Sequence, residues 1–390
     1  VVVNTCCFIG DAKEESINTI LQMAELKKNG RLKALIVTGC LAQRYKQEII
    51  DEIPEVDAIL GTTSYEAVGA AIREVMDGET PEIFESIDAP VSTATERLIT
   101  TGGHYAFLKI AEGCDKRCTY CIIPYARGPI RSLPLEEAAC EAKRLAGAGY
   151  RELVLTGIEI SSWGHDLKNG QGLIDLVEAV CAAAPECRVR LGSLEPRTVT
   201  EDFCRRAAAL PNLCPHFHLS MQSGCDSVLA RMNRKYDSER YYESVRLLNE
   251  AYETPGITTD LIVGFPGETE EEFQQTLAFI RRCAFSAMHI FPYSRRTGTP
   301  AAKMPDQIPN AVKEERAHRA GALAKRLEEA YLDSWVGEPL PVLFEEEKDG
   351  LWRGHAPNYV EVFAQGEELH NVERTVRILR REGSSLVGQL

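Results

Sequence analysis

The sequence lacks any apolar run near the ~20 residues that a membrane-spanning helix needs, so we expect no transmembrane segment. It also lacks a basic start followed by a small-residue cleavage site, so nothing in it resembles a secretory signal. An initiator methionine is missing, and the chain opens on the apolar run VVV, which is typical of the middle of a strand. We therefore expect residues to precede Val1.

An excess of positive charge is missing as well. Lys and Arg number 44 against 58 Asp and Glu, a net charge of −14, so any nucleic-acid binding must depend on local basic patches. The thirteen cysteines are odd in number and scattered, unlike the dense, even spacing of a secreted disulfide scaffold. We expect a reducing, cytoplasmic compartment and thiols that serve metal binding or catalysis.

The 390 residues are enough for two or three domains, taking roughly 100–200 residues per domain. Residues 1–77 alternate short apolar runs with amphipathic helical stretches, which predicts a small parallel α/β domain. Residues 78–103 carry Gly, Pro, Ser and Thr without sustained periodicity and are predicted to be a linker.

From Tyr105 the strand–helix alternation resumes and repeats six times. The candidate strands are 105–113, 152–160, 188–195, 216–222, 257–266 and 287–294. Six βα units in a row predict an α/β fold, an incomplete parallel barrel over residues 104–335 with its chemistry at the carboxyl ends of the strands. A charged helix at 311–335 ends it. The short alternating strands of 336–390 predict a small closed, OB-like β-barrel.

The strongest chemical signal is CDKRCTYC (114–121), directly after the first barrel strand. The thiols of Cys114, Cys118 and Cys121 can converge on three corners of a cubane iron–sulfur cluster, which leaves one iron open to a substrate or cofactor. The alternative is a structural zinc knuckle, which needs a fourth ligand; no Cys or His follows before Cys140. The strand–loop setting favours the open cluster.

This motif, with the aromatic Tyr120 before its last cysteine, resembles that of the radical S-adenosylmethionine enzymes. The longer string GCDKRCTYCIIPYARGPIRS (113–132) is similar to the methylthiotransferases among them. Further matching segments are RLGSLEPR (190–197), CPHFHLSMQSGCDSVLARMNRKY (214–236), TTDLIVGFPGETEEEF (258–273) and FPYSRRTGTPAAKMPDQIP (291–309). The resemblance covers the whole chain and implies a cluster-binding N-terminal domain, a radical core and a C-terminal TRAM domain.

The resemblance also implies the cofactors: two 4Fe-4S clusters and S-adenosylmethionine, with an electron donor such as flavodoxin or ferredoxin. One S-adenosylmethionine would methylate a sulfur on the auxiliary cluster. A second would be cleaved at the open iron to a 5′-deoxyadenosyl radical, which takes a hydrogen from the carbon that receives the methylthio group. No side chain is then expected to act as a catalytic acid or base, and the protein ligates, positions and excludes water.

Cys6 and Cys40 each follow a predicted strand of the first domain, in NTC and TGC. Taken alone, both are read as small buried hydrophobic residues. The resemblance implies instead that they are two of the three ligands of the auxiliary cluster, the third lying upstream of Val1. Cys7 adjoins Cys6, so we expect its side chain on the opposite face of the sheet, where it is a poor substitute.

Polar residues at the strand ends are candidates for binding S-adenosylmethionine: Tyr120, Thr156, Glu159, Ser193, Glu195, His218, Gln222 and Gly264. Glu195 would face the barrel interior and needs a partner, either a ligand or a salt bridge to Arg190 or Arg197; both alternatives stay open. Gly264, in GFPGE, belongs to a tight strand-to-helix turn, and the resemblance also implies a place near the adenosine.

Basic residues gather in the same loops: Lys116, Arg117, Arg127, Arg131, Arg231, Arg234, Lys235, Arg295 and Arg296. On an acidic protein such a rim would attract a polyanion such as RNA, with strong salt dependence. The alternative is a set of ordinary solvated charges. For the C-terminal barrel, RNA contact rests on the resemblance and on two aromatic candidates, Trp352 and Tyr359.

From Arg127 onward the chain is most similar to the branch that modifies N6-threonylcarbamoyladenosine beside the tRNA anticodon. Residues 1–77 look more like the branch that methylthiolates an aspartate of a small-subunit ribosomal protein. Because the core and the C-terminal domain hold the substrate, we predict a tRNA methylthiotransferase acting at C2, monomeric and not bound to membranes. The alternatives are the ribosomal aspartate and a catalytically silent RNA-binding homologue with an incomplete auxiliary cluster.

Overall fold

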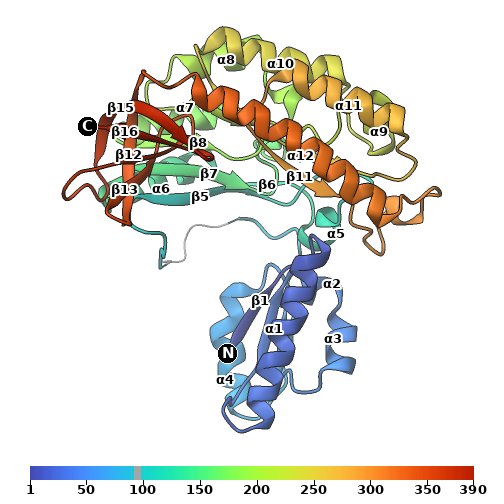
Figure 1. Ribbon diagram of the computed structural model, residues 1–390. Helices are drawn as coiled ribbons and strands as arrows, with labels where there is room; N and C mark the ends of the chain where they lie inside the picture. The colour runs from blue at the N-terminus through green and yellow to red at the C-terminus, as the bar shows by residue number, and fades with distance from the viewer. Residues whose placement is uncertain (92–97) are drawn as a thin grey trace. The chain divides into compact units, whose positions relative to one another are not determined.

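The computed structural model describes residues 1–91 and 98–390, and its elements are labelled in Figure 1. The chain divides into two compact units. The N-terminal unit comprises Val1–Pro90, Glu112–Arg131 and Ser294–Met304, and the barrel unit comprises Val91–Ala111, Ser132–Tyr293 and Pro305–Leu390. Residues 92–97 of the predicted linker lie outside the described residues.

A four-stranded parallel sheet forms the core of the N-terminal unit, as predicted. Its strands, in spatial order, are β1 (Val2–Thr5), β2 (Ile36–Gly39), β3 (Ala58–Leu60) and β4 (Glu82–Ile83). The last of these falls within the predicted linker, where Glu82 pairs with Ile59 and Ile83 with Leu60. The sequence hid this strand because only two residues take part in the pairing.

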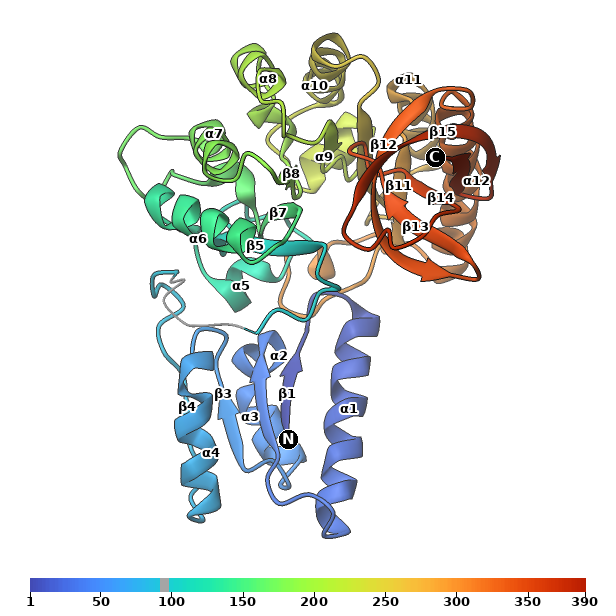
Figure 2. The ribbon, with the colours of Figure 1, turned by 90° about the vertical axis from the view of Figure 1, so that its left-hand side faces the viewer.

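Helices cover both faces of this sheet (Figure 2). The helical segments of the unit are α1 (Gly10–Lys28), α2 (Cys40–Arg44), α3 (Lys46–Glu52), η1 (Tyr65–Ala67), α4 (Val68–Met76), α5 (Ile123–Arg127) and η4 (Ala301–Lys303). Val37 of β2 packs with Ile20 of α1, whereas its neighbour Ile36 packs with Ala71 of α4. Successive strand residues point to opposite faces, so a strand such as β2, in which every residue is buried, needs cover on both sides.

The barrel unit contains the six predicted strands and one short strand that was not predicted, β6, arranged as the sheets β6-β5-β7-β8 and β11-β10-β9. Their bounds are β5 (Tyr105–Glu112), β6 (Arg131–Ser132), β7 (Glu152–Gly157), β8 (Arg188–Leu191), β9 (His216–His218), β10 (Gly256–Val263) and β11 (Ala287–Pro292). Isolated parallel bridges, Val189 with Leu213 and Leu194 with Leu219, continue the arc between the two sheets. The expectation of an incomplete parallel barrel is confirmed.

The helices of the barrel unit alternate with these strands, and α12 runs alongside β11 (Figure 1). They are α6 (Leu135–Gly147), η2 (Ile160–Ser162), α7 (Leu173–Ala183), η3 (Pro196–Thr198), α8 (Glu201–Ala208), α9 (Asp226–Arg231), α10 (Ser238–Ala251), α11 (Glu270–Cys283) and α12 (Asn310–Asp333). Within residues 1–91 and 98–390, no helix is both long and apolar enough to cross a bilayer.

The C-terminal segment of the barrel unit is a closed five-stranded barrel, in agreement with the predicted all-β domain. Its strands are β12 (Pro339–Lys348), β13 (Leu351–His355), β14 (Glu361–Ala364), β15 (Glu373–Glu382) and β16 (Ser385–Gln389). Val342, Phe344, Val362, Val376 and Leu386 fill its interior. Closure removes the exposed sheet edges that so small a β-domain would otherwise present.

A buried ion pair lies where this small barrel meets the parallel strands. The carboxylate of Glu152 on β7 binds Arg190 of β8 at 2.7 and 2.9 Å, and these residues are only 7% and 3% exposed. Arg188 adds a third contact at 2.8 Å. Burial raises the pKa of Glu152, but the two guanidinium groups outweigh it and lower the pKa to about 2. The carboxylate therefore stays ionised.

Tyr359, one of the two aromatic candidates for RNA contact, packs on this ion pair. Its ring stacks against the rings of His216 and His355, and each pair of ring centroids is 4.9 Å apart. The guanidinium carbon of Arg190 lies 4.6 Å from the centroid of the Tyr359 ring. Trp352 packs against the interior of the C-terminal barrel. Both aromatic residues thus have packing partners within the barrel unit.

Replacing Glu152→Gln should destabilise the barrel unit by about 3–5 kcal/mol, because it leaves Arg190 buried without its counter-charge. In the native protein the folded-state pKa of about 2 lies below the ordinary 4.5, so the stabilisation is complete above the ordinary value and is lost as pH falls from it towards 2. Denaturant unfolding between pH 7 and 3 measures both effects. Glu253→Gln, at an exposed loop position, is the control and should cost less than about 0.5 kcal/mol. Equal midpoints for the two variants would contradict the account.

Candidate metal centre

The three cysteines of the C-x3-C-x2-C motif share one loop, which leaves the carboxyl end of β5 and ends at α5. Cys118 is buried, and Cys114 and Cys121 are half-buried. The Cys121 N–H donates to the Cys118 carbonyl at 3.1 Å, and the Cys114 N–H donates to the carbonyl of Gly128 at 3.0 Å. The loop is therefore closed at its base, and its three thiols belong to a single turn of chain.

Gly113 makes this closure possible. Its φ of +73° lies in the left-handed region that favours glycine. A Cβ atom at this position would also overlap the carbonyl oxygen of Pro129. The residue before Cys114 must therefore be glycine for two independent reasons, a backbone angle and a close approach.

The thiol donors of this loop fit the predicted cluster. Among residues 1–91 and 98–390, no three or more His, Cys, Asp or Glu side chains gather around one point closely enough to hold a single metal ion. A cubane cluster does not require such a gathering, because each of its thiolates binds a different iron. Three thiols, one fewer than the usual four, suit a 4Fe-4S cluster that keeps one iron for another ligand.

A second group of thiols lies at the carboxyl ends of β1 and β2. Cys6 follows β1, and Cys40 begins α2 and is buried. Cys7 and Cys40 lie in one buried cluster and each thiol shifts the pKa of the other, so the expectation that Cys7 faces away from the site is wrong. The reason is that β1 ends at Thr5. The alternation of side chains along a strand does not extend into the turn that carries the two cysteines.

Cys40 also contacts a cation. The Nε atom of Arg127, the last residue of α5, donates to Cys40 Sγ at 3.0 Å. The hydrogen bond from Cys7 and the charge of Arg127 lower the pKa of the Cys40 thiol to about 6, against the opposing effect of burial. A thiol so placed readily ionises to the thiolate that binds iron. Arg127, predicted for the RNA rim, is thus engaged within the N-terminal unit.

The candidate cofactor contacts of the barrel unit lie at the ends of its strands, as the sequence predicts. Thr156 is on β7 and half-buried, and Glu159, just beyond it, is half-buried too. Ser193 is exposed after β8. Gln222 is buried and has a φ of +67°, an unusual angle for a residue with a side chain. Such strain concentrates at functional sites, which keeps Gln222 a candidate.

Glu195 and Tyr120 have partners that the structure identifies. The buried carboxylate of Glu195 is bound by Arg197 at 2.7 and 3.0 Å, so of the two candidate arginines it is Arg197 that forms the salt bridge. Arg190 is used by Glu152 instead. Tyr120 is buried in the N-terminal unit, and its carbonyl accepts from Arg296 Nη1 at 2.9 Å.

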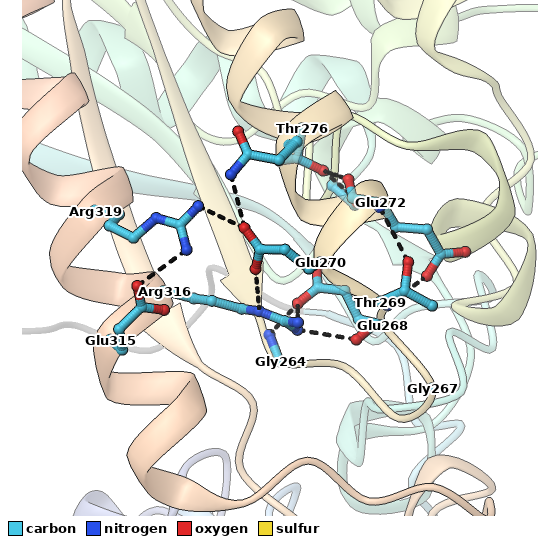
Figure 3. Close-up of polar contacts among 12 residues, drawn as sticks. Gly264, Gly267, Glu268, Thr269, Glu270, Glu272, Thr276, Glu315, Arg316 and Arg319 are labelled. Carbon is cyan, nitrogen blue, oxygen red and sulfur yellow. Dashed lines mark hydrogen bonds and ion pairs between the residues drawn. The ribbon is translucent and has the colours of Figure 1, made fainter.

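Gly264 lies in a tight turn held by a buried ion pair (Figure 3). Its N–H donates to Glu268 Oε2 at 2.6 Å, and Arg316 Nη1 binds the same oxygen at 2.8 Å. Burial raises the pKa of Glu268, while Gly264 and Arg316 oppose the increase. Gly264 has a φ of +70°, and a Cβ there would overlap the side chain of Lys313. The turn therefore requires glycine for structural reasons alone.

The other basic residues of the predicted rim make contacts within their own units. In the barrel unit Arg231 pairs with Glu272 at 2.7 Å, Arg234 donates to Tyr236 Oη at 2.9 Å and Lys235 donates to Asn233 at 2.6 Å. In the N-terminal unit Arg131 donates to the Ala89 carbonyl at 2.7 Å, Arg295 to the Ala302 carbonyl at 2.9 Å, and Arg296 lies over the ring of Phe8. RNA binding by these residues stays a prediction.

Two aromatic side chains of the barrel unit are exposed, and the sequence did not predict this. On β5, Phe107 is 45% exposed although its neighbours Ala106 and Leu108 are fully buried. On β11, Phe291 is 43% exposed. Strand alternation could have indicated the exposure of Phe107, because Phe107 stands among residues that face the opposite side of the sheet. The sequence could not show that these side chains stay exposed in the fold.

Polar side chains lie on the adjacent strands β9, β10 and β11 of the same unit. Tyr241 of α10 hydrogen-bonds Thr259 at 3.1 Å, so the helices cover that face of β10, and Asp260 points to the other. There Asp260 Oδ2 lies 3.2 Å from His218 Nε2. His289 pairs in register with Asp260 on the adjacent strand. Of these residues the sequence analysis singled out His218 alone.

Two protein-family models match the chain: the Radical SAM superfamily over residues 108–280, and Uncharacterized protein family UPF0004 over residues 1–61. Among its relatives is a ribosomal protein uS12 methylthiotransferase RimO of Lachnoclostridium phytofermentans, 42% identical, with the match covering 100% of this chain and 90% of that protein. Another is a threonylcarbamoyladenosine tRNA methylthiotransferase MtaB of Bacillus subtilis, 37% identical, covering 94% of this chain and 82% of that protein.

The fold is similar to that of a solved radical S-adenosylmethionine methyltransferase, TsrM of Kitasatospora setae. The TM-score is 0.55 at 15% identity, and the match covers 74% of this chain and 60% of that one, so the likeness concerns the fold alone. Radical SAM enzymes use S-adenosylmethionine and a 4Fe-4S cluster, and methylthiotransferases carry two clusters. The two groups of thiols described above are the candidate donors for these clusters.

Gly113→Ala should lower the iron bound after anaerobic reconstitution, by up to the share of one of two clusters, because the added Cβ displaces the loop that carries Cys114. Gly147→Ala is the matched control, since Gly147 ends α6 with open space around it. Iron and sulfide analysis, with the visible absorbance of the cluster, provides the measurement. Wild-type iron content in both variants would show that the loop does not depend on this close approach.

Proposed function

Because the chain belongs to the radical S-adenosylmethionine methylthiotransferases, we propose that it inserts a methylthio group at C2 of N6-threonylcarbamoyladenosine next to the anticodon of tRNA. The observation that carries this choice of substrate is the exposure of two aromatic side chains on strands of the barrel unit, Phe107 and Phe291. Single-stranded RNA bases bind proteins by stacking on such rings. An aspartate side chain has no flat apolar face to stack.

The similarity to a tRNA methylthiotransferase over 94% of this chain supports the same substrate. His218 on β9 and Asp260 on β10, which contact each other, are suited to hydrogen-bond the polar groups of a modified base. The acidic net charge of the chain does not favour RNA, so binding would rest on exposed basic residues such as Lys235 and Arg295.

In this proposal Cys114, Cys118 and Cys121 hold the radical cluster, and Cys6 and Cys40 are two ligands of the auxiliary cluster. When bound, the cofactors supply the radical that removes the hydrogen and the sulfur that replaces it. The protein ligates these groups, orients S-adenosylmethionine through the polar residues at the strand ends, and excludes water. Buried residues of the loop, such as Tyr120, serve the last of these functions. A flavodoxin or ferredoxin would supply electrons.

The second candidate is methylthiolation of an aspartate in the small-subunit ribosomal protein uS12. It is favoured by the similarity to a uS12 methylthiotransferase over the full length of this chain, at 42% identity. The same chemistry would then act on a polypeptide loop. The two candidates differ only in what the barrel unit must recognise.

The substrate is decided by expressing the full-length protein in cells that lack their own enzyme and analysing tRNA nucleosides by mass spectrometry. We expect methylthio-threonylcarbamoyladenosine to appear. Peptides of uS12 from the same cells provide the second arm, and we expect the aspartate to stay unmodified. A modified aspartate with unmodified tRNA would overturn the tRNA proposal in favour of the ribosomal protein. Modification of neither, by a cluster-loaded protein, would favour a silent RNA-binding homologue.

Phe291→Ala should lower kcat/KM for tRNA, since base–aromatic stacking contributes about 1–3 kcal/mol per base, or roughly 5- to 150-fold. The slow formation of 5′-deoxyadenosine without tRNA should be unchanged. Leu379→Ala, on the C-terminal barrel, is the control because Leu379 is a large apolar residue without an aromatic ring and is 51% exposed. Unchanged kcat/KM in both variants would contradict stacking of a base on Phe291.

A further inference from the structure

Arg127 lies between the two groups of cysteines. It ends α5, the short helix that begins two residues after Cys121. Its Nε atom donates to Cys40 Sγ at 3.0 Å. One side chain thus joins the loop that carries the C-x3-C-x2-C motif to a thiol at the end of β2.

The position of Arg127 is well defined by its surroundings. Its carbonyl accepts a hydrogen bond from Arg131 Nη2 at 2.9 Å, and the preceding carbonyl, of Ala126, accepts from Thr62 Oγ1 at 2.9 Å. The end of α5 is therefore tied to two further parts of the N-terminal unit. The guanidinium is three-quarters buried, with its side chain 25% exposed. A residue that met RNA at a rim would keep this group in water.

A guanidinium removed from water needs negative charge nearby. Glu112 supplies one carboxylate, but its Oε1 is 3.5 Å from Arg127 Nη1, which is long for an ion pair of this kind. The nearer acceptor is the sulfur of Cys40. Hydrogen bonds from a donor to a ligand sulfur raise the reduction potential of an iron–sulfur cluster, and residues that contact ligands also orient them.

We infer that Arg127 is a positioning residue for the auxiliary cluster. It holds Cys40 by a charge-assisted hydrogen bond, raises the reduction potential of the cluster on that thiol, and fixes Cys40 relative to the loop of Cys114. The inference rests on the proposed function in one respect, the presence of a cluster on Cys6 and Cys40. It does not depend on which substrate is modified.

The direct test is an EPR-monitored redox titration of the full-length protein. Replacing Cys114, Cys118 and Cys121 with alanine leaves the auxiliary cluster alone. In that background Arg127→Gln, which removes the charge, should shift the midpoint potential of the cluster to a lower value. Arg127→Lys keeps a charge and should shift it less. Arg73→Gln is the control, because Arg73 is exposed on α4 of the same unit.

A wild-type potential in a folded, iron-loaded Arg127→Gln variant would overturn the inference. If that variant does not fold, the lysine variant decides, because equality with the wild type would count against a role of the Nε donor. A merely structural residue would change iron content or unfolding temperature while the loaded cluster kept its potential.

Turnover provides an independent readout in the protein with both clusters. Arg127→Gln should lower methylthio product more than 5′-deoxyadenosine formation, whereas Cys118→Ala should lose both. Equal loss of both in the arginine variant would contradict a role confined to the auxiliary cluster. If the wild type modifies neither tRNA nor uS12, the proposed function fails, yet the shift in potential still decides the role of Arg127.

Discussion

The close approach of Gly113 to the carbonyl of Pro129 is the constraint on which the metal centre depends. It lets the chain turn sharply at the end of β5, so that the following thiols are closed into one loop by the hydrogen bond from Cys114 to Gly128. The same hydrogen bond holds Gly128, which directly follows α5 and Arg127, the residue that contacts Cys40. The backbone contact of Gly113 with Pro129 thus shapes the loop that carries Cys114, Cys118 and Cys121. The same loop leads into α5, which carries the Arg127 that contacts Cys40.

Elsewhere the fold uses buried charge for structure. Glu152 with Arg190, and Glu268 with Arg316, are ion pairs in which both partners are shielded from water. Each carboxylate also accepts a further hydrogen bond, which such a pair needs if attraction is to offset desolvation. The turn at Gly264 is an example. Its N–H donates to Glu268, so a hydrogen bond within the protein holds this strand-to-helix turn.

Much of the architecture followed from periodicity. Parallel strands, incomplete barrel and closed C-terminal barrel were all predictable, because apolar runs of strand length alternate with amphipathic helices. The misses have local causes. Strand β4 was missed because only Glu82 and Ile83 pair with β3, which is too short for a periodic pattern in the sequence. The placement of Cys7 was wrong because β1 ends at Thr5. The salt bridge of Glu195 stayed undecided between two arginines until the fold showed Arg190 used elsewhere.

The sequence by itself determined the chemistry. Thiol spacing within a loop is a local property, so CDKRCTYC predicted a radical cluster, and the longer strings around it indicated the family, without any knowledge of tertiary contacts. Only the tertiary structure decided which side chains surround that chemistry. Arg127 contacts Cys40 although 87 residues separate them, and Asp260 contacts His218 from a later strand of the chain. Such contacts arise when segments distant in sequence pack together. A linear pattern of charge or hydrophobicity indicates whether a residue is buried, but it does not indicate which residues it packs against.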